Sequence, residues 1–297
     1  MITEDNIAKV VELFKARQVN LYHACQLQDF EAYLNLGGIP SRKRLEISKK
    51  EFTAFATDEM DRENGVWDKV FVNLSDFGTT FANGGGGTPN PYGPILLTIY
   101  PSALKEAEDI AITLRSAGAA DFNREQESLS CCEEVDRLFA RPVEEGYPAS
   151  SFIKFKGELQ TEFNFPLAKS PEINCSYARG VIPMNYVSQI MVDPYCFSNQ
   201  RLLDLVMSLT HLCNFQIRTR IRKCKCIERI LVYKEIAEAS ASKIPTLEEL
   251  ATLENGSQEL KRWVAQMQVN SLEWQLNRFA GYLREGTILP ALSMINS

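Results

Sequence analysis

The chain has 297 residues, of which 45% are hydrophobic and 24% are charged. These values exclude a disordered, collagen-like or disulfide-scaffold chain, and the length suffices to bury a core. The net charge of −6 excludes broad adhesion to polyanions, although the charge is unevenly spread. Residues 1–200 hold 19 basic and 28 acidic residues, whereas residues 201–297 hold 13 and 10. We therefore expect any polyanion contact to be confined to the basic stretch 215–229.

The N-terminus and the cysteines indicate a cytoplasmic protein. Residues 1–5 lack the basic and apolar runs of a signal peptide, and no stretch approaches 18 uncharged apolar residues. The eight cysteines include no CxxC pair, and the chain has only two histidines. This arrangement predicts free, reduced thiols, no metal site and no membrane contact.

The residues before the glycine run alternate between helical and strand patterns. Apolar residues recur at helical spacing, and Gly37-Gly38 is typical of a helix end. The expected elements are, in chain order, a helix over 4–18, a strand over 19–24, a helix over 26–36, a weakly helical segment over 41–64 and a buried strand over 69–74.

A glycine run, Gly84–Gly87, precedes a series of predicted strands. It lacks the GxxxxGK[ST] spacing and follows no strand directly, so a flexible connection is favoured over a phosphate cradle. The elements expected after it are strands over 94–100 and 110–114, a helix over 121–140, an irregular connection over 141–170, and strands over 172–175 and 187–192 joined through 181–183.

The last third combines helical patterns with one basic strand. We expect an amphipathic helix over 199–212 and further helices towards the C-terminus. Residues 215–222 alternate apolar and basic side chains, which predicts a strand with Arg218, Arg220 and Arg222 on one face. That face is a candidate contact for a nucleic-acid backbone, and the alternative is a basic edge strand that discourages aggregation.

Two isolated residues are the candidates for chemistry. The sequence has no GxSxG motif, no Rossmann fingerprint and no recognisable triad around a histidine. His23 lies at the end of one predicted strand and Glu172 at the start of another. On pattern alone, His23 is also compatible with a core or turn histidine, and Glu172 with a solvated surface group.

The order of the motifs resembles the DarT-like ADP-ribosyltransferase family. Its members open with a strand that ends in Tyr-His, then a short helix and a glycine turn, and they later carry a strand that begins with Glu. The resemblance runs in order from residue 19 to about residue 225. The segments that carry it are Leu21-Tyr22-His23, Leu36-Gly37-Gly38-Ile39-Pro40, Asp68–Ser75, Gly93–Leu97, Ile110–Phe122 and Pro171–Val192.

The resemblance implies an α+β fold. Its core would be an ADP-ribosyltransferase-like split β-sheet, mixed or antiparallel, with flanking helices. The catalytic domain would cover residues 1–232, and a C-terminal helical extension would cover 233–297. This extension would pack on the catalytic domain or, alternatively, dock an antitoxin or chaperone. NAD would be the co-substrate, with no metal.

The resemblance also implies roles for individual residues. Glu172 would hold a ribose hydroxyl, stabilise an oxocarbenium-like transition state and accept the proton of the nucleophile. His23 would donate a hydrogen bond to the adenosine-side ribose, and Ser75 would bond to NAD. Cys25 and Asn73 fall at further cofactor-binding positions, where relatives often carry Thr and an aromatic residue.

The family also uses an arginine between the first helix and the central strand. Arg42, Arg44 and Arg62 fall in this segment. We favour Arg62 for the catalytic role because it lies nearest to the central strand, and Arg44 as a cofactor-binding residue. The alternative for such an arginine is a solvated helix face.

The resemblance implies an enzyme that transfers ADP-ribose to a nucleic-acid base. A base must be unstacked to react, so single-stranded substrate is expected, with DNA favoured. Such a protein would be the toxin of a toxin–antitoxin or phage-defence system. Two alternatives stay open: the same chemistry on RNA or protein, and an inactive binding module of the same fold, which Cys25 and Asn73 favour.

Overall fold

The computed structural model describes most of the first 222 residues. The predicted glycine loop at 84–87, the boundary at 232 and the predicted C-terminal helices lie outside the described residues. The described residues are 2, 4–53, 58–76, 94–141, 154, 156–164, 171–192, 196–197 and 200–222.

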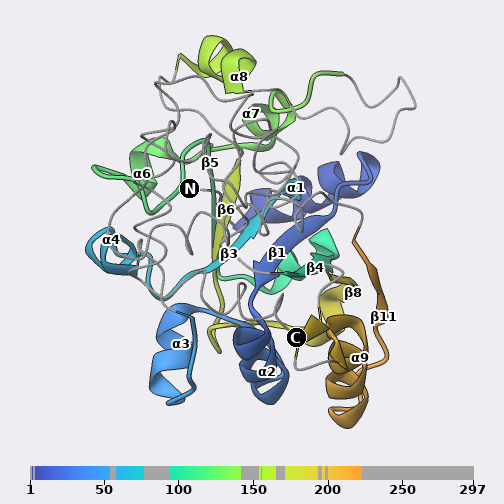
Figure 1. The fold of residues 1–297 in the computed structure, drawn as a ribbon. Coiled ribbons are helices and arrows are strands. Elements are labelled where there is room, and N and C mark those ends of the chain that lie inside the picture. Colours follow the sequence, from blue (N-terminus) through green and yellow to red (C-terminus); the bar gives the residue numbers. More distant parts are fainter. Residues whose placement is uncertain are drawn as a thin grey trace, which may run out of the picture.

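A seven-stranded sheet lies at the centre of the described part (Figure 1), in the order β11-β8-β4-β1-β3-β6-β5. Its neighbouring strands are antiparallel, except that β11 and β8 are parallel. With the flanking helices, this arrangement confirms the predicted α+β class and the mixed, mainly antiparallel sheet. The strands are β1 (Leu21–Cys25), β3 (Val70–Asn73), β4 (Ile95–Ile99), β5 (Asp109–Thr113), β6 (Glu172–Ser176), β8 (Val187–Val192) and β11 (Arg218–Ile221).

The sheet is split between β1 and β3. These two strands are in register at Tyr22 opposite Asn73, whereas β1 pairs with β4 along its whole length. Beyond that point the ring of His23 takes the place of a backbone partner, because its Nδ1 lies 2.8 Å from the carbonyl oxygen of Phe71. The sheet therefore has two halves, β11-β8-β4-β1 and β3-β6-β5, as expected for a split sheet.

The two faces of the sheet differ in polarity. Side chains alternate along each strand, so one face collects the apolar residues of all the strands except the edge strand β11 in the main core. Helix α1 (Glu4–Ala16) adds Val10, Val11 and Phe14 to that core. The opposite face is mostly polar and carries Tyr22 and Glu172. The buried strand residues of the core face include Val72, Leu97, Ile112, Ile173 and Ile190.

Short helices surround the sheet. In the view of Figure 1, α2, α3 and α9 lie towards one end of the strands, and α7 and α8 lie towards the other. No helix of the described residues is both long and apolar enough to cross a membrane. The remaining helices are α2 (Leu27–Leu36), α3 (Arg42–Ile47), α4 (Asp58–Glu63), η1 (Pro101–Glu106), α6 (Arg124–Glu127), α7 (Cys132–Asp136), α8 (Lys156–Phe163), η4 (Met184–Tyr186) and α9 (Leu202–Leu212).

A small two-stranded sheet, β2 (Gly38–Pro40) with β7 (Val181–Pro183), fixes the start of α3. Gly37 ends α2 in the left-handed conformation with φ 75°, which confirms the predicted helix end. A Cβ on Gly38 would lie 2.1 Å from the carbonyl oxygen of Ile182, so this position accepts glycine alone. A second short pair joins β9 (Cys196–Phe197) and β10 (Gln200–Arg201).

Two predicted segments differ from the structure. The helix expected over 121–140 is divided into α6 and α7, because Ser128 between them forms a bridge with Thr113 of β5. The connection over 141–170, expected to be irregular, contains α8. Leu159 of α8 is buried, but most of the other residues in this helix are polar, so the periodicity that indicates a helix is weak.

Candidate active site

A row of polar side chains crosses the sheet on the face opposite the main core. Directly opposed residues on neighbouring strands point to the same face, so the registers place these side chains in one line. At the split, Asn73 lies between Tyr22 and Glu172. Two residues predicted from the sequence, Asn73 and Glu172, are thus neighbours. From edge to edge the row is Arg218, Gln189, Thr98, Tyr22, Asn73, Glu172 and Thr113.

Glu172 begins β6, and its carboxyl lies against the turn that follows β5. The backbone N–H of Ala117 donates to Oε1 at 3.0 Å, and the hydroxyl of Ser116 donates to Oε2 at 3.5 Å. Burial raises the pKa of Glu172 to about 7, the charge of Asp61 adds to this effect, and the bonds from Ala117 and Ser116 oppose it. A carboxyl with this pKa exchanges its proton near neutral pH, as general acid–base catalysis requires.

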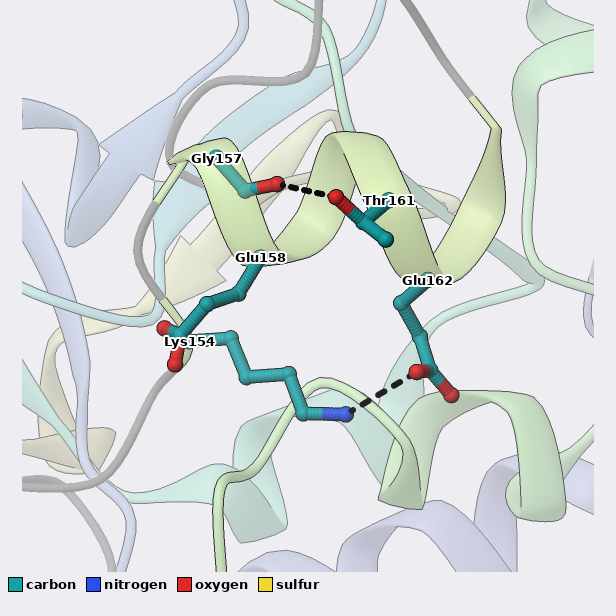
Figure 2. Close-up of a pocket in the computed structure, with 5 residues that line it drawn as sticks. All are labelled: Lys154, Gly157, Glu158, Thr161 and Glu162. Carbon is teal, nitrogen blue, oxygen red and sulfur yellow. Dashed lines mark hydrogen bonds and ion pairs between the residues drawn. The ribbon is translucent and has the colours of Figure 1, made fainter.

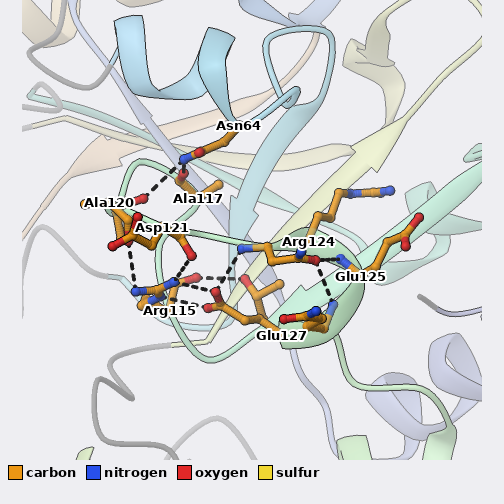
Figure 3. Close-up of polar contacts among 12 residues, drawn as sticks. Asn64, Arg115, Ala117, Ala120, Asp121, Arg124, Glu125 and Glu127 are labelled. Carbon is orange, nitrogen blue, oxygen red and sulfur yellow. Dashed lines mark hydrogen bonds and ion pairs between the residues drawn. The ribbon is translucent and has the colours of Figure 1, made fainter.

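Asp61 of α4 is a second carboxyl that acts on this site. Burial raises its pKa to about 6, with Asp58 adding to the effect and Arg42 opposing it. Helix α4 is joined to the turn because Nδ2 of Asn64 donates to the carbonyl oxygen of Ala117 at 2.6 Å (Figure 3). Within the described residues, no three His, Cys, Asp or Glu side chains converge as metal ligands would.

His23 is neutral, and both of its ring nitrogens have partners. Nδ1 lies 2.8 Å from the carbonyl oxygen of Phe71, and Nε2 lies 3.0 Å from the hydroxyl of Tyr33. A carbonyl only accepts, so Nδ1 carries the proton and Tyr33 donates to Nε2. Burial lowers the pKa of His23 to about 4, the bond to Phe71 opposes this, and the charge of Arg42 adds to it. The bond from His23 to a ribose stays a prediction, because both ring nitrogens have protein partners here.

Cys25 and Ser75 lie at the ends of the two strands that flank the split. Cys25 ends β1 and is buried, and burial together with the charge of Asp29 raises the pKa of its thiol. The thiol is therefore a neutral, enclosed group at neutral pH. Ser75 follows β3 and is partly exposed. The cofactor-binding roles of both residues stay predictions.

The contacts of Arg62, the arginine favoured from the sequence, do not include Glu172. Its exposed guanidinium pairs with Glu46 at 3.0 Å and lies 3.6 Å from the ring centroid of Trp67. Successive residues on a helix point about 100° apart. Arg62 faces α3, so its neighbour Asp61 points in another direction, and the charge of Asp61 raises the pKa of Glu172. The predicted catalytic role of Arg62 has no support in these contacts.

Arg42 is the arginine whose charge reaches the site. Its guanidinium pairs with Asp58 at 2.7 Å and lies 4.4 Å from the ring centroid of Phe52. After the larger effect of burial, its charge contributes to the lowered pKa of His23. Arg44, two residues further along the same helix, is exposed. Sequence position alone could not separate the two, because both fall in one short helix.

The edge strand β11 carries two exposed arginines. Arg218 and Arg220 are exposed and lie on the face of the polar row. Arg222 differs from the prediction, because it is 3% exposed and its guanidinium is paired with the carboxylate of Asp76. The strand ends at Ile221, so the period of two that placed Arg222 with the other arginines does not continue to it.

Several members of this site were not predicted. Tyr22 belongs to the motif Leu21-Tyr22-His23 but was not predicted as a site residue, although its strand position places it on the same face as Asn73. Asp61 was one acidic residue among many in a charged segment. Ala117 acts through its backbone N–H, which leaves no trace in a side-chain pattern.

A hollow of the surface beside α8 lies apart from this site (Figure 2). Its side chains satisfy one another, since Lys154 lies 3.7 Å from the carboxylate of Glu162 and the hydroxyl of Thr161 donates to the carbonyl oxygen of Gly157 at 3.0 Å. Glu158 lines the hollow as well. We place no function in it.

The solved structures that are similar to this chain include two of one protein. One is DarT of Thermus sp. 2.9 in complex with ADP-ribosylated ssDNA, with a TM-score of 0.43 and 14% sequence identity, covering 69% of this chain and 94% of that one. The other is the same DarT in complex with NAD+, with a TM-score of 0.38 and 13% identity, covering 69% and 95%. No protein-family model and no curated protein sequence matches the chain. Both structures are of DarT, whose family the sequence motifs resemble.

Proposed function

We propose that this chain is an NAD-dependent ADP-ribosyltransferase that modifies a base of single-stranded nucleic acid, with DNA favoured. The observation that carries the proposal is the place of Glu172, at the split of the sheet beside Asn73, with a pKa of about 7. His23, far away in the chain, lies on β1, across the split from β3, and its ring bonds to Phe71 and Tyr33. The motifs that resemble the DarT-like family thus lie on three neighbouring strands, β1, β3 and β6.

The polar row fits a polar co-substrate such as NAD. The buried hydroxyl of Thr98 has no hydrogen-bond partner in the described part of the chain. An unpartnered buried hydroxyl is unfavourable, and a ligand with ribose and phosphate groups along the row would give it a partner. Tyr22 and Asn73, next to it in the row, offer further hydroxyl and amide groups.

The chemistry assigns one proton to Glu172. The bond between ribose C1′ and nicotinamide breaks, and nicotinamide leaves with the electron pair. A nitrogen or oxygen atom of the target base bonds to C1′, and its proton passes to the Glu172 carboxylate. The ionised carboxylate also stabilises the positive charge that develops on the ribose. Because the ionised form is needed, the rate should rise with pH through about 7 and then level off.

Arg218 and Arg220 support the nucleic-acid part of the proposal. They are exposed on the same face as Glu172, on an otherwise acidic chain of net charge −6. We include in the proposal a role as a cytoplasmic toxin of a toxin–antitoxin or phage-defence system, with an antitoxin or chaperone as partner. Expression should then arrest growth of a host cell, and Glu172→Gln should relieve the arrest.

The testing experiment offers labelled NAD to several targets in parallel. These are single-stranded DNA, RNA of the same sequence, duplex DNA and lysate protein. We expect label on single-stranded DNA, lost in Glu172→Gln and kept in Glu108→Gln, an exposed carboxyl beside β5 that receives the same change. Label unaffected by Glu172→Gln would overturn the assignment of this residue.

The inactive binding module is the second candidate. It is favoured by the ring of His23, whose two nitrogens already have protein partners, and by the burial of Cys25. Under this alternative the protein binds NAD in calorimetry, yet transfers no label to any of the targets. Label on RNA or protein only would instead move the proposal to another substrate.

A further inference from the structure

The turn between β5 and α6 is braced from within by Arg115 (Figure 3). Its guanidinium donates to the carbonyl oxygens of Ala120 at 3.1 Å and Asp121 at 2.9 Å, and it pairs with the carboxylate of Glu127. Glu127 also accepts from the backbone N–H of Asn123 at 2.9 Å. Arg115 is 8% exposed, so these charge-assisted bonds are shielded from water. The turn is therefore held in one shape.

Helix α4 is docked on this turn. The side chain of Asn64, just after α4, donates to the carbonyl oxygens of Ala117 at 2.6 Å and Ala119 at 3.2 Å. Val66, Ala117 and Phe122 form a small buried apolar cluster separate from the main core. Polar and apolar contacts thus join the turn to the end of α4.

Ala117 connects this unit to Glu172. Its carbonyl accepts from Asn64, and its own N–H donates to Oε1 of Glu172 at 3.0 Å. Asp61 lies three residues before Asn64, a spacing that places both on one side of a helix. The same segment therefore brings to Glu172 a fixed hydrogen-bond donor, through the turn, and a negative charge.

We propose that Asn64 and Asp61 are positioning residues for Glu172: Asn64 fixes the turn whose backbone amide holds the carboxyl, and Asp61, on the same side of the segment as Asn64, brings a second carboxyl to that end of β6. The inference concerns the proposed transfer reaction and rests on it for its functional meaning. The other charged groups that act on Asp61 are Asp58 of the same helix and Arg42 of α3. The two positioning residues act in opposite directions, so the charge of Glu172 is set by their balance.

Variants of the two residues should move the titration of Glu172 in opposite directions. The bond from the N–H of Ala117 favours the ionised carboxylate of Glu172. Asn64→Ala frees the turn and weakens this bond, so the titration midpoint of Glu172 should rise. Asp61→Asn removes a negative charge, so the midpoint should fall. We expect shifts of about half a pH unit each. A merely structural role would lower stability and leave the midpoint in place.

The direct measurement is a ¹³C NMR titration of protein labelled at glutamate carboxyls. The signal of Glu172 is assigned by its loss in Glu172→Gln, so the titration needs no enzymatic activity. Glu63→Gln, an exposed carboxyl at the end of α4, is the matched control and should cause no shift. Ser116→Ala is a second variant for the case that Asn64→Ala does not fold, because Ser116 is exposed. It removes the donor to Oε2 of Glu172, so it should raise the titration midpoint slightly.

The pH dependence of label transfer is then measured on the same variants. Opposite shifts in titration and in rate support the inference. Opposite shifts in titration without any transfer uphold the positioning role and overturn the proposed function. Unmoved midpoints in Asp61→Asn and Ser116→Ala, with transfer intact, overturn the inference and leave the proposed function standing.

Discussion

The two ends of the β5–β6 pair surround a carboxyl in opposite ways. Asp109 lies at one end, opposite Ser176, and Glu172 lies at the other end, opposite Thr113. Both side chains are on the same face of the sheet, because Ser176, opposite Asp109, is an even number of positions along β6 from Glu172. Arg124 pairs with one oxygen of Asp109, and the hydroxyl of Ser176 donates to the other at 2.7 Å.

These surroundings give the two carboxyls opposite pKa shifts. Burial alone would raise the pKa of Asp109, but the bonds from Arg124 and Ser176 outweigh it and the pKa is lowered. Glu172 receives neutral donors and the negative charge of Asp61, so burial prevails and its pKa is about 7. The end at Asp109 therefore holds an ionised carboxylate in an ion pair. The end at Glu172 holds a carboxyl that can exchange its proton near neutral pH.

The largest expected effect is on activity, where substitutions of Glu172 and Asp109 should differ. Glu172→Gln should lower kcat/KM for transfer to single-stranded DNA by a factor of about 10²–10⁴, the usual range for losing a general base. Asp109→Asn should leave it almost unchanged, because Asp109 is bound to cations at the far end of the strands. Labelled NAD measures both rates, and equal losses would break the comparison.

Stability should show the reverse order. Asp109→Asn removes the carboxylate that pairs with both Arg124 and Lys69, so it should cost about 2 kcal/mol of unfolding free energy. This is less than for a fully buried pair, because Asp109 is one-third exposed. Glu172→Gln should be neutral or stabilising at pH 8. Urea denaturation measures both, with Glu125→Gln on the surface of α6 as the control. A larger loss in Glu172→Gln would contradict the contrast.

The pH dependence of stability sharpens the comparison. The folded pKa of Glu172, about 7, is above its ordinary 4.5, so its contribution is present below pH 4.5 and lost as pH rises through 7. Between pH 5 and pH 8, the free energy of unfolding of Glu172→Gln should therefore rise by about 1–2 kcal/mol relative to that of the natural chain. The pKa of Asp109 is lowered, so its contribution is lost only at acid pH and stays constant over this range.

The smallest effect concerns the basic edge of the polar row. Arg218→Gln and Arg220→Gln should each flatten the salt dependence of single-stranded DNA binding by about 0.7 in log–log slope. Arg222→Gln should instead lower stability, because it breaks the buried pair with Asp76. Fluorescence anisotropy at several salt concentrations gives the slopes. An unchanged slope in both exposed variants would remove this edge from the binding surface.

The strands could be predicted because their patterns are local. The run of β4 is apolar except for Thr98, and β11 alternates basic residues with Thr219 and Ile221. The pairing of Asn73 with Glu172 needed more than pattern, since nothing local relates two strands so far apart in the chain. The family resemblance gave the order of the motifs along the chain, and the pairing of these two strands comes from the structure.

The rest of the site depends on the directions in which side chains and backbone N–H groups point, which a sequence pattern does not show. Arg62 was favoured for its nearness to β3, but on a helix the neighbouring Asp61 points elsewhere and acts on Glu172. Arg222 follows the alternating pattern, yet it lies beyond the end of its strand and is buried. The backbone N–H of Ala117 has no side-chain signal at all.

The most direct test is whether Glu172 takes the proton in the transfer reaction. The measurement is the rate of label transfer from NAD to single-stranded DNA between pH 5 and pH 9, for the natural chain and for Glu172→Gln. The natural chain should rise through a midpoint near 7 and level off, and Glu172→Gln should be at least about 100-fold slower and flat. A natural rate that does not change with pH, or an equally fast Glu172→Gln, would contradict the central claim.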